Sequence, residues 1–315
     1  MGVLGWHHAR HLVSMPEAEL VGVYDIRPDR SAFVARALGT RACSTREELL
    51  EGASAVTIAV PTAVHGEVGL AALAAGVAVF MEKPLAASME EADALILASE
   101  RYGAPLQVGH IERFNRALRA ATPYLDRPMF IEGERLAPFQ PRGTDVPVVL
   151  DLMIHDLDLI LHLAGGAGAT EVRANGATVL SGLLDVAHAR VEFASGLVAS
   201  VTASRIAEER VRRLRIYQAD GYLSLDLASG RGEFLRLRNA WIPGEVRDLD
   251  DVAERVPLET PAADALRLEL AGFLGSVRGE QNAVVTGLEG RAALELALKV
   301  TEAVRLASLT VHADS

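Results

Sequence analysis

The stretch MGVLGWHHAR, residues 1–10, places Gly2 and Gly5 three residues apart at the start of a helical pattern. A dinucleotide-binding turn needs glycines where the backbone approaches the pyrophosphate, a helix N-terminus aimed at that group, and an acidic residue about twenty positions later for the ribose. Asp25 stands at that interval and follows the apolar run ELVGVY (19–24). The stretch therefore predicts a Rossmann unit. An aspartate at the ribose also favours NAD over NADP, because a carboxylate repels the additional phosphate.

The region from Glu19 to His110 alternates short apolar runs with helix-length stretches, a pattern typical of parallel strands joined by crossover helices. The expected strands are ELVGVY (19–24), AVTIAV (55–60), VAVFME (77–82) and PLQVGH (105–110), with helices at about 28–38, 64–75 and 88–102. We predict a doubly wound α/β Rossmann domain over residues 1–115.

After Asn115 the residues alternate between apolar and polar with short breaks, which predicts an open, mainly antiparallel sheet. Its expected strands lie within 129–136, 170–179, 186–193, 197–205, 211–218 and 222–227. One apolar helix at about 148–164 interrupts them, and two more helices end the chain, the last started by a Thr286–Glu289 capping box. We predict an α+β domain over residues 116–315.

Composition limits the possible functions. The formal net charge of -11 disfavours broad electrostatic binding of nucleic acid or anionic membranes. Cys43 is the only cysteine, which excludes an intramolecular disulfide and indicates a reducing compartment. No signal peptide or membrane-length apolar run is visible, so we expect a cytoplasmic protein.

Two stretches place polar groups where strands of the first domain end, the edge at which open parallel sheets bind ligands. AVPTAVHGE (59–67) contributes Pro61, Thr62 and His65, and MEKPLA (81–86) contributes Glu82 and Lys83. We expect these residues to bind the cofactor. Two simpler interpretations are that His65 only begins a helix and that Lys83 and Glu82 form a solvated ion pair.

The apolar helix at 148–164 carries Asp151, His155, Asp158 and His162 at intervals of four, three and four, on one helical face. They indicate either a carboxylate-oriented general base, Asp151 with His155, or a divalent metal site. Four ligands along one straight helix would span about 16 Å, too far for one ion. We therefore favour the base and expect no metal.

Two other groups of residues suggest binding sites. His7, His8 and His11 have a spacing that could suit a metal, but no carboxylate accompanies them in the sequence, so we reject that interpretation. Arg142, in the loop PFQPRGTD (138–145) before the apolar helix, is a candidate for binding a substrate phosphate. Arg113 and Arg135 are further candidates nearby in the sequence.

Taken together, the GxxG turn, Asp25, PTAVH (61–65), MEKPLA (81–86) and DLMIH (151–155) resemble the glucose-fructose oxidoreductase, inositol dehydrogenase and MocA-like (Gfo/Idh/MocA) family over nearly the whole chain. The resemblance implies an N-terminal Rossmann domain and nicotinamide-dependent oxidation of sugar-like alcohols. It also implies that the α+β domain over 116–315 binds substrate and forms a homo-oligomer, a dimer or tetramer, through its sheet. The catalytic positions of the family correspond to Lys83, Asp151 and His155.

Three longer stretches, at 108–117, 135–159 and 213–227, resemble a narrower branch of that family, which oxidises the 3-hydroxyl of UDP-N-acetylglucosamine. We therefore expect an NAD-dependent oxidoreductase acting on that or a related nucleotide sugar. Two alternatives remain: a dehydrogenase of free polyols such as inositol, and a non-catalytic protein on the same fold that senses NAD or sugar.

The sequence departs from the family pattern at two places. Thr62 stands where many members carry asparagine, and the first strand and first glycine of the Rossmann motif are missing, because aligning Gly5 with the third glycine puts the first before Met1. We expect the recorded start to be internal to the natural gene, or the chain to be a truncated form. We also expect weaker NAD binding than in a version extended upstream by about six to ten residues.

Overall fold

The structure is a computed structural model that describes residues 1–140, 146–238, 248–259 and 262–313. Its contacts divide the chain into two compact units, Met1–Ile111 with Ala263–Leu294, and Glu112–Ala262 with Glu295–Ser315. These units differ from the expected division at residue 115, because residues 263–294 return to the first unit. Within the described residues no helix is long and apolar enough to cross a membrane.

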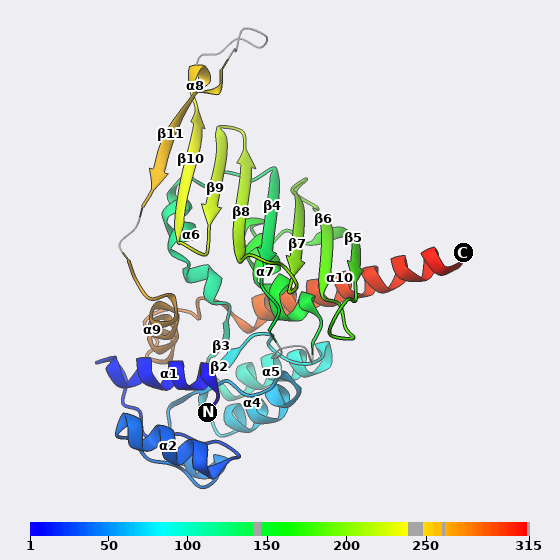
Figure 1. Cartoon of the computed structure of the whole chain (residues 1–315). Coiled ribbons are helices and arrows are strands. Elements are labelled where there is room, and N and C mark those ends of the chain that lie inside the picture. The colour runs from blue at the N-terminus through cyan, green and yellow to red at the C-terminus, as the bar shows by residue number, and fades with distance from the viewer. Residues whose placement is uncertain (141–145, 239–247, 260–261, 314–315) are drawn as a thin grey trace. The chain divides into compact units, whose positions relative to one another are not determined.

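The first unit contains a three-stranded parallel sheet in the order β1-β2-β3, with helices between successive strands (Figure 1). The strands are β1 (Ala55–Ile58), β2 (Ala78–Glu82) and β3 (Leu106–Gly109). Its helices are α1 (Val3–Ser14), α2 (Pro28–Leu38), α3 (Arg46–Glu51), the 3-10 turn η1 (Thr62–Val64), α4 (His65–Ala74), α5 (Met89–Tyr102), α9 (Ala265–Val277) and the start of α10 (Gly287–Ala313). The predicted crossover pattern is confirmed for all three strands.

Helix starts follow local capping chemistry. The Ser88 hydroxyl accepts a hydrogen bond from the Glu91 amide at 3.2 Å, which starts α5. At α10, the Glu289 amide donates to Thr286 Oγ1 at 3.2 Å and the Thr286 amide donates to Glu289 Oε2 at 2.9 Å. This reciprocal pair is the predicted capping box.

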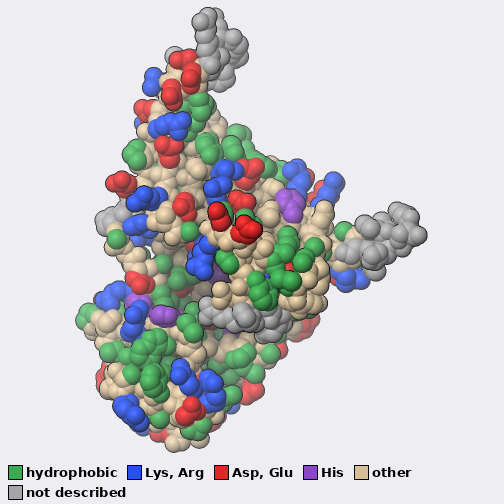
Figure 2. All heavy atoms as spheres, viewed as in Figure 1, with side chains coloured by type: hydrophobic (Ala, Val, Ile, Leu, Met, Phe, Trp, Pro, Cys, Tyr) green, Lys and Arg blue, Asp and Glu red, His purple; other side chains and the backbone are tan. Residues whose placement is uncertain are grey.

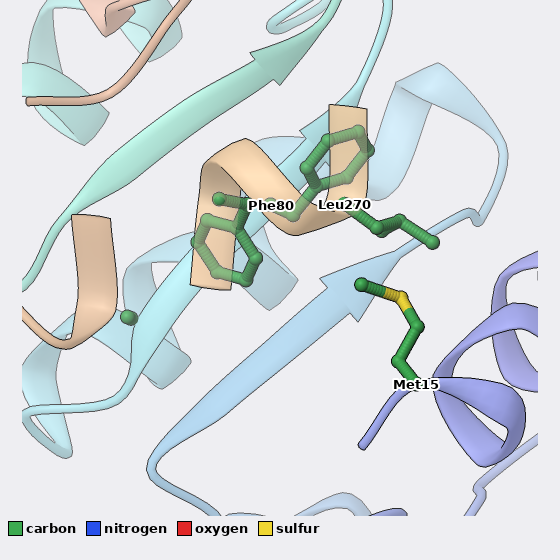
Figure 3. Close-up of a cluster of buried hydrophobic side chains, with 5 residues drawn as sticks. Met15, Phe80 and Leu270 are labelled. Atoms are coloured by element: carbon green, nitrogen blue, oxygen red, sulfur yellow. The ribbon is translucent and has the colours of Figure 1, made fainter. Parts of the chain in front are cut away.

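A buried apolar cluster explains why residues 263–294 belong to the first unit. Phe80 of β2 packs against Phe273 of α9 with ring centroids 5.7 Å apart, and Leu270, Met15 and Ala78 complete the cluster (Figure 3). Each of these side chains is at most 2% exposed. Helix α9 thus supplies part of the core beneath the sheet.

The expected strand ELVGVY (19–24) does not join the sheet. Its backbone partners are residues 41–43, through hydrogen bonds from the Val23 amide to the Arg41 carbonyl and from the Cys43 amide to the Val23 carbonyl. Only Val23 forms a β-bridge, to Ala42. The prediction of a full strand is wrong because an apolar run becomes a strand only along a paired backbone, and here the pairing extends over one bridge.

The second unit contains an eight-stranded sheet in the order β11-β10-β9-β8-β4-β7-β6-β5 (Figure 1). All neighbours are antiparallel except β4 and β7, which are parallel. The strands are β4 (Phe130–Leu136), β5 (Ala169–Ala177), β6 (Val186–Phe193), β7 (Val198–Ser204), β8 (Val211–Gln218), β9 (Gly221–Asp226), β10 (Arg231–Leu237) and β11 (Ala253–Leu258). The sequence prediction missed β10 and β11. The helical elements are η2 (Ile111–Phe114), α6 (Arg116–Ala121), η3 (Thr122–Tyr124), the π-helical turn η4 (Val149–Met153), α7 (Ile154–Leu163) and α8 (Leu249–Val252).

The two faces of this sheet differ in character. Residues such as Ile131, Val201 and Ile216 lie on one face and are fully buried. Helix α7 covers this face, since an added Cβ on Gly133 would lie 3.6 Å from the Cβ of Asp156. The opposite face carries cross-strand ion pairs, and Figure 2 shows acidic and basic side chains interspersed over the strands. We call these two surfaces the covered face and the open face.

Candidate active site

The first turn of α1 has the features that a pyrophosphate requires. Gly2 is the N-cap, no side chain caps the helix, and the first turn contains no acidic residue. The first amides of a helix otherwise lack partners and attract anions. Gly5 is buried, and an added Cβ would lie 4.0 Å from the Cβ of Ala59, just beyond the end of β1. The helix start and the carboxyl end of β1 are therefore neighbours, as a dinucleotide site needs.

Asp25 lies beside this helix start. Its carboxylate pairs with the Met1 ammonium and accepts a hydrogen bond from the Arg27 amide at 2.9 Å. Arg30 also reaches the start of the helix, donating to the Met1 carbonyl at 2.9 Å. The structure thus brings Asp25 to the N-terminal end of α1, which is the arrangement that ribose and pyrophosphate recognition requires.

His65 is the first residue of α4, where the sequence placed it, and its side chain is buried in the fold. Its ring is only 1% exposed, with Nδ1 2.8 Å from the Pro84 carbonyl oxygen and Nε2 3.0 Å from the Val60 carbonyl oxygen. The ring therefore connects the segments that follow β1 and β2. Pro61 is exposed and Thr62 is half-buried in the intervening turn. Among these three residues, His65 supports the sheet edge while the other two remain accessible to a ligand.

Glu82 and Lys83 lie where β2 ends. The Glu82 carboxylate accepts a hydrogen bond from His8 Nε2 at 2.9 Å, and its other oxygen lies 3.3 Å from the Lys83 amide, which donates to it. His8 is 1% exposed, and its Nδ1 has no hydrogen-bond partner among the described residues. The peptide bond between Lys83 and Pro84 is cis. Glu82 is therefore held from two sides and fixes the backbone that presents Lys83.

His8 was not among the residues expected in the site. The available signal was its place three residues after Gly5, on the helix expected to face the cofactor. The structure also brings a carboxylate to the other candidate histidine, since Asp264 lies 3.5 Å from His11 Nε2. Burial lowers the pKa of His11, despite the opposing effect of Asp264. No group of three metal-ligating side chains was found among the described residues.

Asp151 and His155 lie in and just after the π-helical turn that leads into α7. Residues 149–153 form this turn, and both side chains are half-buried. The backbone amide of Asp151 donates a hydrogen bond to the Pro147 carbonyl at 3.1 Å. π-Helical turns are frequent at functional sites. They change the angular spacing of the side chains, so the single helical face expected from the sequence does not describe this segment.

The other polar residues of this helix belong to ion pairs. Asp158 is fully buried and accepts two hydrogen bonds from Arg113, each of 2.7 Å. Arg113 also lies 2.8 Å from His162 Nδ1. Arg113 therefore fixes the helix rather than presenting a guanidinium to a ligand.

Arg135 is also engaged within the fold. It is 2% exposed and donates to both oxygens of Asp156, at 2.7 and 2.9 Å, and to Glu112 at 2.8 Å. Burial acts to lower the pKa of Arg135, but the two carboxylates outweigh it and raise the pKa above its usual value. Burial raises the pKa of Asp156, while Arg135 opposes that rise. The guanidinium groups of Arg113 and Arg135 are thus engaged with buried carboxylates, so we do not propose them as substrate ligands. Arg142 lies outside the described residues.

Comparisons with known proteins agree with this arrangement. Residues 1–110 match the oxidoreductase family with an NAD-binding Rossmann fold (GFO/IDH/MocA), and residues 131–224 match the GFO/IDH/MocA C-terminal domain. The chain is 38% identical over 313 residues to UDP-N-acetylglucosamine 3-dehydrogenase from Acidithiobacillus ferrooxidans, covering 96% of this chain and 95% of that protein. A solved structure of that enzyme superimposes with a TM-score of 0.90 at 36% identity, covering 96% of this chain and 95% of the other. The chain is also 30% identical to scyllo-inositol 2-dehydrogenase (NAD(+)) from Bacillus subtilis, covering 97% of this chain and 92% of that protein.

Proposed function

Because the chain belongs to the Gfo/Idh/MocA family of NAD-binding oxidoreductases and is a dehydrogenase, we propose that it oxidises the 3-hydroxyl of UDP-N-acetylglucosamine, or of a related nucleotide sugar, to a ketone. The similarity to UDP-N-acetylglucosamine 3-dehydrogenase over nearly the full length of both chains carries this proposal. Similarity to an inositol dehydrogenase supports the second candidate, a free polyol.

Residues of the first unit would hold the cofactor. The open first turn of α1, with Gly2 and Gly5, suits the pyrophosphate, and Asp25 suits the ribose hydroxyls of NAD. Pro61 and Thr62 would line the edge of the sheet, where the ring of His65 contacts the carbonyls of Val60 and Pro84. When bound, NAD accepts a hydride from the substrate carbon.

Three residues, His155, Asp151 and Lys83, would perform the acid–base chemistry. His155 would take the proton of the sugar hydroxyl, and Asp151 would orient its imidazole and stabilise the charge that forms. Lys83 would hydrogen-bond the reacting oxygen, with its backbone fixed by Glu82. The half-buried positions of Asp151 and His155 suit this role, because each remains partly accessible to a substrate.

The open face of the eight-stranded sheet supports a proposal of homo-oligomerisation, as a dimer or tetramer. Tyr217 stacks on Tyr222 there, with ring centroids 4.9 Å apart, among the cross-strand ion pairs. Size-exclusion chromatography with light scattering tests this proposal. We also propose a cytoplasmic location, consistent with the single cysteine, Cys43, which is free and buried.

NADH formation measured with UDP-N-acetylglucosamine, N-acetylglucosamine and inositols tests the reaction. We expect turnover of the nucleotide sugar, and NAD binding without turnover of any compound would favour the sensor instead. The H155A variant should lose about two to four orders of magnitude in kcat. H188A, which removes an exposed histidine of β6, should retain wild-type turnover. Equal turnover of H155A and the wild type would remove His155 from the proposed role.

A further inference from the structure

Two arginines lie directly opposite each other on the covered face of the sheet. Arg135 of β4 and Arg212 of β8 are register partners in the antiparallel pair. Like charges directly opposite each other destabilise a sheet unless other groups compensate them. The carboxylates around this pair therefore determine what each guanidinium can bind.

Arg135 makes most of the hydrogen bonds to these carboxylates. Three of its nitrogens donate to Asp156 and Glu112, at distances between 2.7 and 2.9 Å. The second oxygen of Glu112 accepts a hydrogen bond from Asn115 at 2.8 Å. The carboxylates near the pair are thus already bound at short distances.

Arg212 has one carboxylate contact, which it shares with Arg135. Its Nη1 lies 3.4 Å from Glu112 Oε1, the same oxygen that Arg135 binds at 2.8 Å. Its side chain is 39% exposed, against 3% for that of Arg135. Burial lowers the pKa of Arg212, and the neighbouring charge of Arg135 lowers it further. The ion pair of Arg212 with Glu112 is therefore long and shared, and its side chain has an exposed surface that a ligand can reach.

We propose that Arg212 binds the diphosphate of the nucleotide sugar and thereby selects a nucleotide sugar over a free sugar. This inference rests on the proposed function. A guanidinium matches the oxygens of a phosphate with two parallel hydrogen bonds, whereas Glu112 offers Arg212 only one oxygen, which it shares with Arg135. Arg212 lies close to α7, because Arg135 binds both the Glu112 oxygen that Arg212 shares and Asp156, the residue after His155.

Another arginine of the same sheet provides a matched control. Arg236 of β10 also lies on the covered-face side and is 47% exposed, comparable with Arg212. Its Nε and Nη2 both donate to Glu254 on the adjacent strand. Arg236 is therefore an exposed arginine that already has a carboxylate partner.

Steady-state kinetics and UDP titration calorimetry on the wild type, R212Q, R212K and R236Q test the proposal. We expect R212Q to raise the KM for UDP-N-acetylglucosamine and the Kd for UDP by about 10- to 100-fold, the effect of losing hydrogen bonds to a charged group. Its kcat should remain close to that of the wild type. R212K should restore part of the UDP affinity, and R236Q should leave both constants unchanged.

The results separate this inference from the proposed function. Turnover of UDP-N-acetylglucosamine by the wild type, with unchanged KM and UDP affinity in R212Q, would overturn the role of Arg212 and leave the reaction standing. An equal effect of R236Q would also overturn it, since it would indicate a general loss of positive charge. If the wild type does not oxidise the nucleotide sugar and does not bind UDP, the proposed function fails and the inference fails with it.

Discussion

Removing the Arg135 guanidinium should destabilise the second unit strongly. Asp156 is 1% exposed and Glu112 is 4% exposed, and both bind Arg135. In R135M these two carboxylates would remain buried without that cation. Breaking a buried ion pair by removing one partner costs about 3–5 kcal/mol. For a unit of this size, that corresponds to a fall in Tm of about 6–20 °C.

The effect should also depend on pH. Burial raises the pKa of Asp156 even beside Arg135, and the loss of Arg135 removes the main group that opposes this rise. A carboxyl whose pKa is raised in the folded state destabilises the fold progressively as pH rises from its unfolded pKa towards the folded one. The stability deficit of R135M relative to the wild type should therefore be larger at pH 8 than at pH 5.

Urea unfolding followed by far-UV circular dichroism at both pH values measures this prediction. E134Q provides the control, because Glu134 precedes Arg135 in β4 and pairs with Arg213 at 3.6 Å on the open face. Such an exposed pair contributes about 0–1 kcal/mol. The double variant R135M/D156N should regain part of the lost stability, since it removes one uncompensated charge. A deficit in R135M no larger than that of E134Q, or one that grows on acidification, would refute the reasoning.

Three further variants test other contacts. H65A leaves the carbonyls of Val60 and Pro84 without their ring partner, so it should cost about 1–3 kcal/mol in stability and weaken NADH binding measured by fluorescence. H8A removes the hydrogen bond that holds Glu82 and should lower kcat by about 2- to 10-fold, measured by steady-state kinetics. D185N should cost about 1.5–3 kcal/mol in urea unfolding at pH 7, because three backbone amides donate to that carboxylate. Burial alone would raise the pKa of Asp185, but the Ser181 side chain and these amides lower it. The stability difference from the wild type should therefore shrink below about pH 4.

The sequence predicted those parts of the fold that local patterns determine. Alternation and helical periodicity located three parallel strands, most of the antiparallel sheet and the principal helices, because burial of one face imposes these periods. Capping residues fixed helix starts at Ser88 and Thr286 for the same local reason. The resemblance identified the family, which the comparisons confirm.

The errors lie where structure depends on distant partners. ELVGVY (19–24) has the composition of a strand, but pairing depends on the neighbouring backbone, and only one bridge forms. The association of residues 263–294 with the first unit depends on contacts of α9 with Phe80, far away in the sequence. The π-helical turn before α7 also has no marker in the residue pattern, because residues 149–153 are as apolar as an ordinary buried helix.

The predicted roles of arginines were the least reliable, because they too depend on partners that are distant in the sequence. Arg113 and Arg135 suggested phosphate binding because the sequence does not show the buried carboxylates that meet them, 45 and 21 residues further along the chain. Their partners, Asp158 and Asp156, stand among the apolar residues of α7. A charged residue within an apolar helix was the available indication that a buried partner existed.

These ion pairs also explain how a helix that is largely apolar can hold the side chain of the proposed general base, His155, in a defined direction. Apolar packing is non-directional, so it constrains the rotation of α7 about its axis only through the shapes of its side chains. Arginine–carboxylate pairs with two parallel hydrogen bonds are directional, and α7 has two of them, through Asp156 to Arg135 and through Asp158 to Arg113. Because neighbouring residues on a helix point about 100° apart, fixing the directions of Asp156 and Asp158 also fixes that of His155. The buried charges, which contribute little net stability compared with apolar replacements, thus determine the orientation of the proposed general base.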